Sequence, residues 1–199
     1  MNSNAGECAG EPLHGGDVEL SVLLGSGIVV GVDVAGEEFS TKTVDERGAS
    51  SDSAADSAHM TGADGRPYTL SASPDAVTSA VHVDGLSAAI QINNAESTDT
   101  LELTSGDRDD SLAASSDLSD VIIVQLRGAG GDDVLSGGDD LEGGAGQDLM
   151  QQAYVGATVE GGSGEDTIIT GSGDITVDGG EDSDTIVVRG TSSSDVIDV

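Results

Sequence analysis

The sequence is poor in aromatic and basic residues. Its 199 residues include no Trp, two Tyr and one Phe, and 6 Lys and Arg stand against 38 Asp and Glu. The formal net charge of −32 argues against nucleic-acid binding, which needs basic side chains on the phosphates, and an anionic membrane surface would repel the chain. Because aromatic rings supply much of the buried area of an ordinary core, the composition also argues against a conventional globular core.

The chain also lacks the features of a disulfide framework, a membrane span and a cleaved leader. Cys8 is its one cysteine, so no internal disulfide can form. The apolar run at 20–32 is too short to span a bilayer and contains three glycines. A Sec signal requires basic residues before its apolar run, and no Lys or Arg precedes this one. We therefore expect no transmembrane segment and no Sec leader.

The sequence divides into four regions. Apolar residues alternate on both sides of Gly25-Ser26-Gly27, which predicts a β-hairpin region, of unknown role, within residues 1–48. Residues 49–63 are rich in Ser, Ala and Asp and predict a flexible linker. Short β-branched runs between turn residues predict degenerate β-solenoid coils over 64–127 and a repeat solenoid over 128–199.

The strongest signal is a nonapeptide repeat. Residues 143–151 (GGAGQDLMQ) and 161–169 (GGSGEDTII) fit the pattern G-G-x-G-x-D-x-U-x, where U is apolar, and 179–187 (GGEDSDTIV) departs from it at Asp182. The intervening units keep the length but carry Ala157 and Ile175 in place of the aspartate. All five units keep an apolar eighth residue: Met150, Val159, Ile168, Val177 and Ile186.

This repeat predicts where carboxylates gather. Six Gly-rich residues form a turn and three form a short strand with its middle residue inward, so two nonapeptides close one flattened coil of 18 residues. Asp148, Asp166 and Asp184 then stack on one edge about 4.8 Å apart, where their mutual repulsion calls for a cation. Carboxylates and turn carbonyls suit Ca²⁺. The candidate ligands are Asp133, Gly144, Gly146, Asp148, Gly162, Gly164, Asp166, Gly180, Asp182 and Asp184.

These repeats resemble the repeats-in-toxin, or hemolysin-type calcium-binding, family of bacterial exoproteins. Residues 127–138 (RGAGGDDVLSGG) are a near match with a shifted glycine pattern, and the resemblance covers about residues 77–199. It implies an all-β, right-handed parallel β-roll with Ca²⁺ between its turns. It also implies export by a type I (ABC transporter) machinery with an uncleaved C-terminal signal. The final residues, Asp195 to Val199, fit either such a signal or one more repeat triplet.

The expected function is therefore calcium binding by a secreted, extracellular domain that folds when Ca²⁺ binds, without enzymatic activity. Two alternatives remain at this point. The chain could belong to a β-helical enzyme acting on polysaccharides, which turnover of a uronate polymer would reveal. It could also be a calcium-dependent adhesin or matrix protein with an unidentified cell or polysaccharide partner. His14, His59 and His82 lack the spacing of a zinc site.

Overall fold

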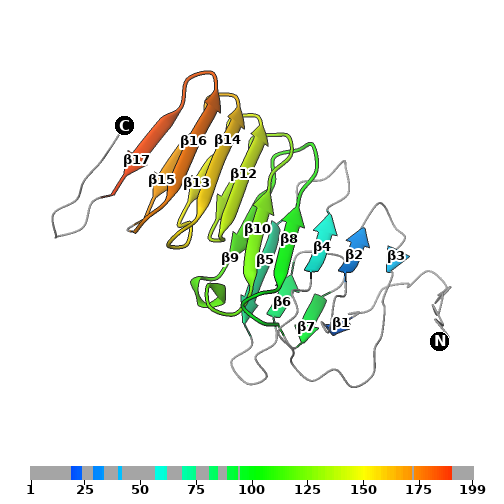
Figure 1. Ribbon diagram of the computed structural model, residues 1–199. Helices are drawn as coiled ribbons and strands as arrows, with labels where there is room; N and C mark the ends of the chain where they lie inside the picture. The colour runs from blue at the N-terminus through cyan, green and yellow to red at the C-terminus, as the bar shows by residue number, and fades with distance from the viewer. Residues whose placement is uncertain are drawn as a thin grey trace.

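The computed structural model describes seven N-terminal strands and, continuously, residues 95–171 and 173–189. Figure 1 shows the strands as rungs of two stacked sheets. The N-terminal strands are β1 (Glu19–Leu23), β2 (Val29–Asp33), β3 (Ser40–Thr41), β4 (Ser57–Thr61), β5 (Thr69–Pro74), β6 (Val81–Asp84) and β7 (Ala89–Asn93). The others are β8 (Thr100–Thr104), β9 (Ser111–Ala114), β10 (Ile123–Arg127), β11 (Val134–Ser136), β12 (Asp140–Ala145), β13 (Leu149–Gln151), β14 (Thr158–Ser163), β15 (Thr167–Thr170), β16 (Thr176–Glu181) and β17 (Thr185–Val188).

Successive strands from β8 onward alternate between the two sheets. The even-numbered strands β8 to β16 pair in parallel in an eight-stranded sheet, and the odd-numbered strands β9 to β17 pair in parallel in a nine-stranded sheet. Each pair, such as β8 and β9, forms one coil, and neighbouring coils stack through the backbone ladders. The described chain is thus a parallel β-solenoid, which confirms the predicted fold class.

The coils differ in length. Partners are 23 residues apart between β8 and β10 (Thr100 and Ile123), 15 apart between β10 and β12 (Gln125 and Asp140), and 18 apart in the two following steps. The predicted 18-residue coil is therefore confirmed for β12 to β17. The longest coil contains the one helical turn of the described residues, a 3-10 turn at Ser116–Leu118.

The predicted hairpin at residues 18–48 is wrong, although its two strands form. β1 pairs with β7 in the nine-stranded sheet, whereas β2 pairs with β4 and β3 in the eight-stranded sheet. The physical reason is that apolar alternation shows only that a strand has one buried face. It does not show whether two successive strands pair with each other or lie in opposite sheets.

Part of the predicted linker at 49–63 is also a strand. β4 lies between β2 and β8 and pairs in parallel with both. Its composition is polar, but Met60 is only 1% exposed and packs into the core. The rest of that segment lies outside the described residues. The region 64–127 contains parallel coils as predicted, but β5, β6 and β7 pair antiparallel to one another.

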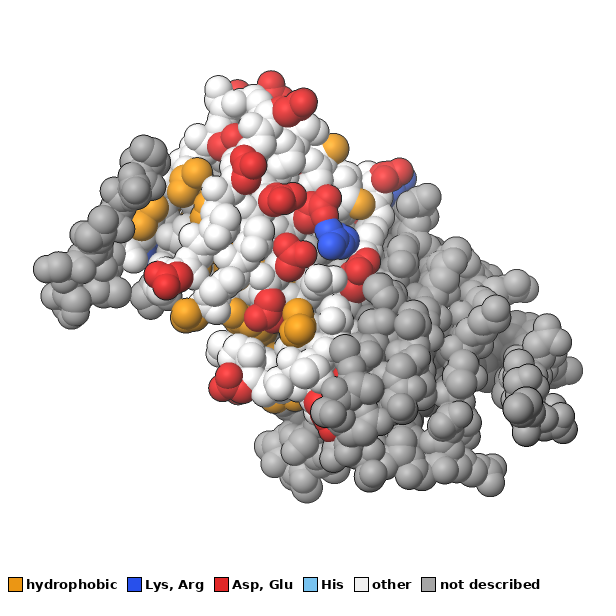
Figure 2. All heavy atoms as spheres, viewed as in Figure 1, with side chains coloured by type: hydrophobic (Ala, Val, Ile, Leu, Met, Phe, Trp, Pro, Cys, Tyr) orange, Lys and Arg blue, Asp and Glu red, His pale blue; other side chains and the backbone are white. Residues whose placement is uncertain are grey.

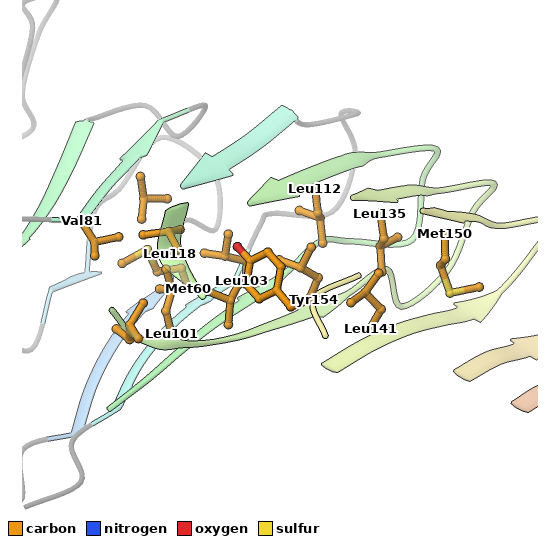
Figure 3. Close-up of a cluster of buried hydrophobic side chains, with 14 of the residues drawn as sticks. Met60, Val81, Leu101, Leu103, Leu112, Leu118, Leu135, Leu141, Met150 and Tyr154 are labelled. Atoms are coloured by element: carbon orange, nitrogen blue, oxygen red, sulfur yellow. The ribbon is translucent and has the colours of Figure 1, made fainter. Parts of the chain in front are cut away.

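The core is a narrow column between the sheets. Figure 3 shows its side chains, which include Leu101 and Leu103 from β8, Leu112 from β9 and Leu135 from β11. The same column continues through Leu141, Met150, Val159 and Ile168, with one main apolar side chain per strand. It thins toward β17, where the equivalent Ile186 is 46% exposed. The predicted inward eighth positions are therefore confirmed for Met150, Val159 and Ile168, whereas Val177 is only partly buried and Ile186 is exposed.

Candidate metal centre

Two kinds of connection join the sheets. We call the edge where the chain passes from the eight-stranded to the nine-stranded sheet the first edge, and the opposite one the second edge. The first edge consists of five six-residue turns in register: 105–110, 128–133, 143–148, 161–166 and 179–184. The last three of these turns begin within the ends of β12, β14 and β16. The turn at 128–133 aligns with the repeat without any shift of its glycines, because Ala129 occupies the second position. The near match inferred from the sequence is thus a full turn of the same kind.

Left-handed backbone at the second and fourth positions explains the glycine pattern. The second position has positive φ at Gly144, Gly162 and Gly180, and the fourth at Gly146 and Gly164. Glycine adopts this region without steric cost. Two non-glycine residues take it as well: Ala129 at the second position, with φ 70°, and Asp182 at the fourth, with φ 78°. Asp182, a predicted ligand, is exposed and stands where a glycine belongs.

The sixth residue of every turn is an aspartate, and these five side chains form a ladder. One carboxylate oxygen (Oδ1) of each of the last four accepts a hydrogen bond from the backbone N–H of the aspartate in the preceding coil. The four bonds run from Asp110 to Asp133 (2.7 Å), Asp133 to Asp148 (2.8 Å), Asp148 to Asp166 (2.8 Å) and Asp166 to Asp184 (3.1 Å). The predicted stacking of aspartates on one edge is therefore present.

The second oxygen (Oδ2) of three of these carboxylates is buried without a hydrogen-bond partner. The residues are Asp133, Asp148 and Asp166, which are 1%, 2% and 1% exposed. Burying a charged oxygen without a partner costs several kcal/mol. Burial raises the pKa of Asp133 to about 7 and that of Asp148 to about 6, and neighbouring aspartate charges add to both rises. The pKa of Asp166 is raised for the same reasons.

Each orphan oxygen faces a glycine that begins its turn. A Cβ atom on Gly128 would come within 3.0 Å of both Asp133 Oδ2 and the carbonyl oxygen of Gly143 in the next coil. The same pair of oxygens, a carboxylate and a carbonyl, crowds Gly143 and Gly161. The absent side chains thus leave three equivalent cradles lined by oxygen. These first-position glycines were missed as site residues, although the doubled Gly of the repeat was a usable signal.

The other predicted glycines serve the stacking of the turns. A Cβ on Gly144, Gly146, Gly162, Gly164 or Gly180 would come within 3.0 Å of a backbone carbonyl oxygen of the preceding coil. Their absence of side chains therefore lets neighbouring turns approach closely. Asp184 lies in the last described turn, where its Oδ2 faces Gly179.

The second edge has no matching row among the described residues. Ala157 and Ile175 occupy its aspartate positions in the last two coils, as the sequence predicts. One coil earlier, Asp139 Oδ2 accepts a hydrogen bond from the N–H of Val124 at 2.8 Å, and burial raises the pKa of Asp139. Sequence reasoning missed this residue, although it lies nine residues before Asp148 and therefore within the period of the repeat.

The charge around the solenoid favours a cation. Figure 2 shows Asp and Glu side chains spread over one face of the molecule, with few basic ones. The side chain of Arg127 already has acidic partners, since it bonds Glu142 and lies 3.7 Å from Glu102 and 3.6 Å from Asp140. In the described chain no three His, Cys, Asp or Glu side chains cluster as a metal site. Any ion at the first edge would therefore need backbone carbonyls besides one carboxylate.

No protein-family model, curated protein or solved structure matches this chain. Within the described residues, no helix has the length and apolar character needed to cross a membrane. The geometry of the first edge thus carries the functional argument. It offers three repeats of one arrangement: a buried anionic oxygen, a neighbouring carbonyl and the open side of a glycine.

Proposed function

We propose that this chain binds Ca²⁺ between the coils of its solenoid, at three places on the first edge. The observation that carries the proposal is the row of buried, unpartnered oxygens on Asp133, Asp148 and Asp166. Each carboxylate, with the carbonyl of the next coil beside it, supplies the oxygen ligands that Ca²⁺ prefers. The 18-residue spacing of the turns that end in Asp148, Asp166 and Asp184 by itself predicts two ions, one between each pair of neighbouring turns. The equivalence of Asp133 to Asp148 and Asp166 raises the proposed number to three.

The choice of Ca²⁺ follows from the ligand chemistry. The cradles contain only oxygen, which disfavours zinc and other ions that prefer nitrogen or sulfur. Mg²⁺ requires compact octahedral geometry and gives up its water slowly, which fits poorly with carbonyls fixed by stacked turns. Ca²⁺ tolerates irregular sets of six to eight oxygens. We expect weak sites, with Kd of about 10⁻⁴–10⁻³ M, as in extracellular calcium modules.

Binding and folding are coupled in this proposal. Without an ion, stacking the turns buries negative charge and brings aspartates together, so part of the apolar stabilisation is lost. When Ca²⁺ is bound, it is attracted by the carboxylate oxygen of one coil and the carbonyl oxygen of the next, so it holds the two coils together. At a net charge of −32, repulsion keeps the coils that contain the proposed sites loosely packed at low calcium, and they become ordered at millimolar calcium. This behaviour agrees with the secreted, extracellular role that the repeat family implies, including export by a type I machinery.

Titration calorimetry of the full chain with CaCl₂ tests the proposal, together with far-UV circular dichroism in 5 mM CaCl₂ and in EGTA. We expect about three ions per chain and a gain of β signal with calcium, and a much weaker effect of 5 mM MgCl₂. Equal spectra and equal melting temperatures with and without calcium would contradict the proposal. Asp174→Ala is the matched control, because Asp174 is an exposed carboxylate at the second edge.

A further inference from the structure

The first turn of the first edge differs from the others at its opening residue. Gly128, Gly143, Gly161 and Gly179 open the later turns, whereas Ser105 opens the turn at 105–110. A side chain fits at this position only because the surroundings differ. Ser105 is 3% exposed, so its hydroxyl is enclosed between the first two coils.

The hydroxyl of Ser105 donates a hydrogen bond to the carbonyl group that corresponds to the proposed cation ligand of the later turns. Its Oγ donates a hydrogen bond to the carbonyl oxygen of Gly128 at 2.6 Å, with a longer contact to that of Arg127 at 3.4 Å. In the same turn, Asp110 Oδ2 accepts a hydrogen bond from the N–H of Gly106 at 3.1 Å. The carboxylate and the carbonyl oxygen at this junction therefore both have protein donors, whereas the Oδ2 atoms of Asp133, Asp148 and Asp166 have none.

We propose that Ser105 ends the row of calcium sites, so that the junction between the first two coils is held by a hydroxyl and needs no ion. This inference rests on the proposed calcium binding at the later turns. A neutral donor in place of a divalent cation makes the N-terminal junction independent of calcium. The row of calcium sites then begins at Asp133, and the side chain of Ser105 determines this N-terminal end of the row.

The apolar core supports the same division. Leu103, Leu112, Leu126 and Leu135 line the first two coils and are fully buried. In the last coil Val177 is only partly buried and Ile186 is 46% exposed. The first two coils therefore have a dense core between them and a junction that needs no metal ion. They form a base that stays folded in low calcium, on which the later coils assemble as ions bind.

The test compares Ser105→Gly with Ser105→Ala by calcium titration calorimetry of the full chain. Ser105→Gly recreates the glycine of the later turns and removes the donor from the Gly128 carbonyl, so we expect four ions in place of three. Ser105→Ala keeps the Cβ atom that fills the cradle, so we expect three ions and a lower melting temperature in EGTA. A count of three for Ser105→Gly overturns this inference alone, whereas a wild-type count of zero overturns the proposed function.

Hydrogen exchange on the wild-type chain in EGTA gives a readout that does not depend on the variants folding. The N–H groups of Ser105 and Asp110 bond across the junction held by Ser105, and those of Asp148 and Asp166 bond across proposed calcium sites. We expect the first pair to stay protected and the second pair to exchange at least tenfold faster than in CaCl₂. Equal loss of protection at all four amides would overturn the inference.

Discussion

The two edges of the solenoid follow different rules. Every turn of the first edge has six residues, although the coils that contain them span 23, 15 or 18 residues. Counted between register-matched strand residues in the same way, the connections of the second edge, 114–124, 137–139, 152–157 and 170–175, have eleven, three, six and six residues. All variation in coil length is therefore confined to one edge. The sheets tolerate either kind of connection, so strand pairing does not impose the constant length.

The difference shows that side-chain chemistry sets the length of the first edge. Each aspartate there bonds the backbone of the aspartate in the coil before it, and one inserted residue would misplace that carboxylate and its neighbours. On the second edge, the comparable bond from Val124 to Asp139 occurs once. A change of length on that side displaces no row of carboxylates, although it disturbs local contacts such as the hydrogen bond from the buried Tyr154 hydroxyl to the carbonyl oxygen of Ser115.

Deleting one residue from each edge should show most clearly that the first edge requires a constant length and the second does not. Removal of Gln147 shifts Asp148 relative to Asp133 and Asp166, so we expect the melting temperature in CaCl₂ to fall by more than about 10 °C, because several kcal/mol are lost at once. Removal of Val155, which is 74% exposed on the second edge, should lower it by less than about 4 °C. Similar losses in both deletions, measured by calorimetry, would show that the two edges are equally constrained.

Single aspartates of the first edge should also differ in a graded way. Asp148 and Asp166 each lie between two described coils and carry a buried orphan oxygen, whereas Asp184 lies in the last described turn. We expect Asp148→Ala and Asp166→Ala to remove one ion each and weaken the others by about tenfold, close to 1.4 kcal/mol. Asp184→Ala should weaken binding less.

Calcium titration of these three variants checks the order. From the sequence alone, Asp166 lies in the middle of the three matching turns, which predicts a larger effect there than at Asp148 or Asp184. The structure makes Asp148 and Asp166 equivalent, because each lies between two described coils and carries an unpartnered buried Oδ2, so we expect equal effects at these two. An effect of Asp184→Ala as large as that of Asp166→Ala would contradict this order.

The pH dependence of the calcium-free protein offers a smaller but distinctive effect. The pKa of Asp133 is about 7 and that of Asp148 about 6 in the folded chain, against about 3.9 when unfolded. The folded state therefore holds protons that the unfolded state has released, so this stability is fully present below pH 4 and is lost as pH rises through 6 and 7. We expect the melting temperature in calcium-free buffer to fall by several degrees between pH 5 and pH 8.

Calcium should change that pH response, since the ion replaces the protons on the same carboxylates. In saturating CaCl₂ the decline between pH 5 and pH 8 should vanish or reverse. Asp148→Asn is the matched variant, because its side chain keeps nearly the same shape without a titrating group, and its calcium-free decline should be shallower. A melting temperature that rises with pH in calcium-free buffer would contradict the assignment.

The smallest expected effect concerns the strained residue of the last turn. Asp182 has φ 78° where Gly146 and Gly164 stand in the preceding turns, and a left-handed non-glycine residue costs about 1–2 kcal/mol. Asp182→Gly should stabilise the calcium-bound protein by about 1 kcal/mol without changing the number of ions. A loss of calcium affinity in this variant would instead show that Asp182 is a ligand, as its place in the repeat first suggested.

The sequence predicted much of the first edge because the repeat encodes it directly. Asp148 and Asp166 lie on the first edge, and Ile168 faces inward, as the nonapeptide requires. The role of Ser105 could not be predicted, because its turn, SGDRDD, shares only the final aspartate and one glycine with the repeat. Asp139 was also missed, although it lies nine residues before Asp148, because the residues before it (VLSGG) do not match the Gly-rich turn of the repeat. Alternation in β1 and β2 predicted strands but could not say which sheet each would join.

The shortened coil has a consequence for how such a chain can change over generations. Asp133 and Asp148 are 15 residues apart and the next aspartates 18 apart, yet each of these carboxylates accepts the same hydrogen bond from the coil before it. A gene encoding this fold can therefore lose or gain a few codons in one coil, provided that they fall on the second edge, while the carboxylates stay aligned. The length of each coil can therefore change independently, while the aspartates of the first edge stay in register.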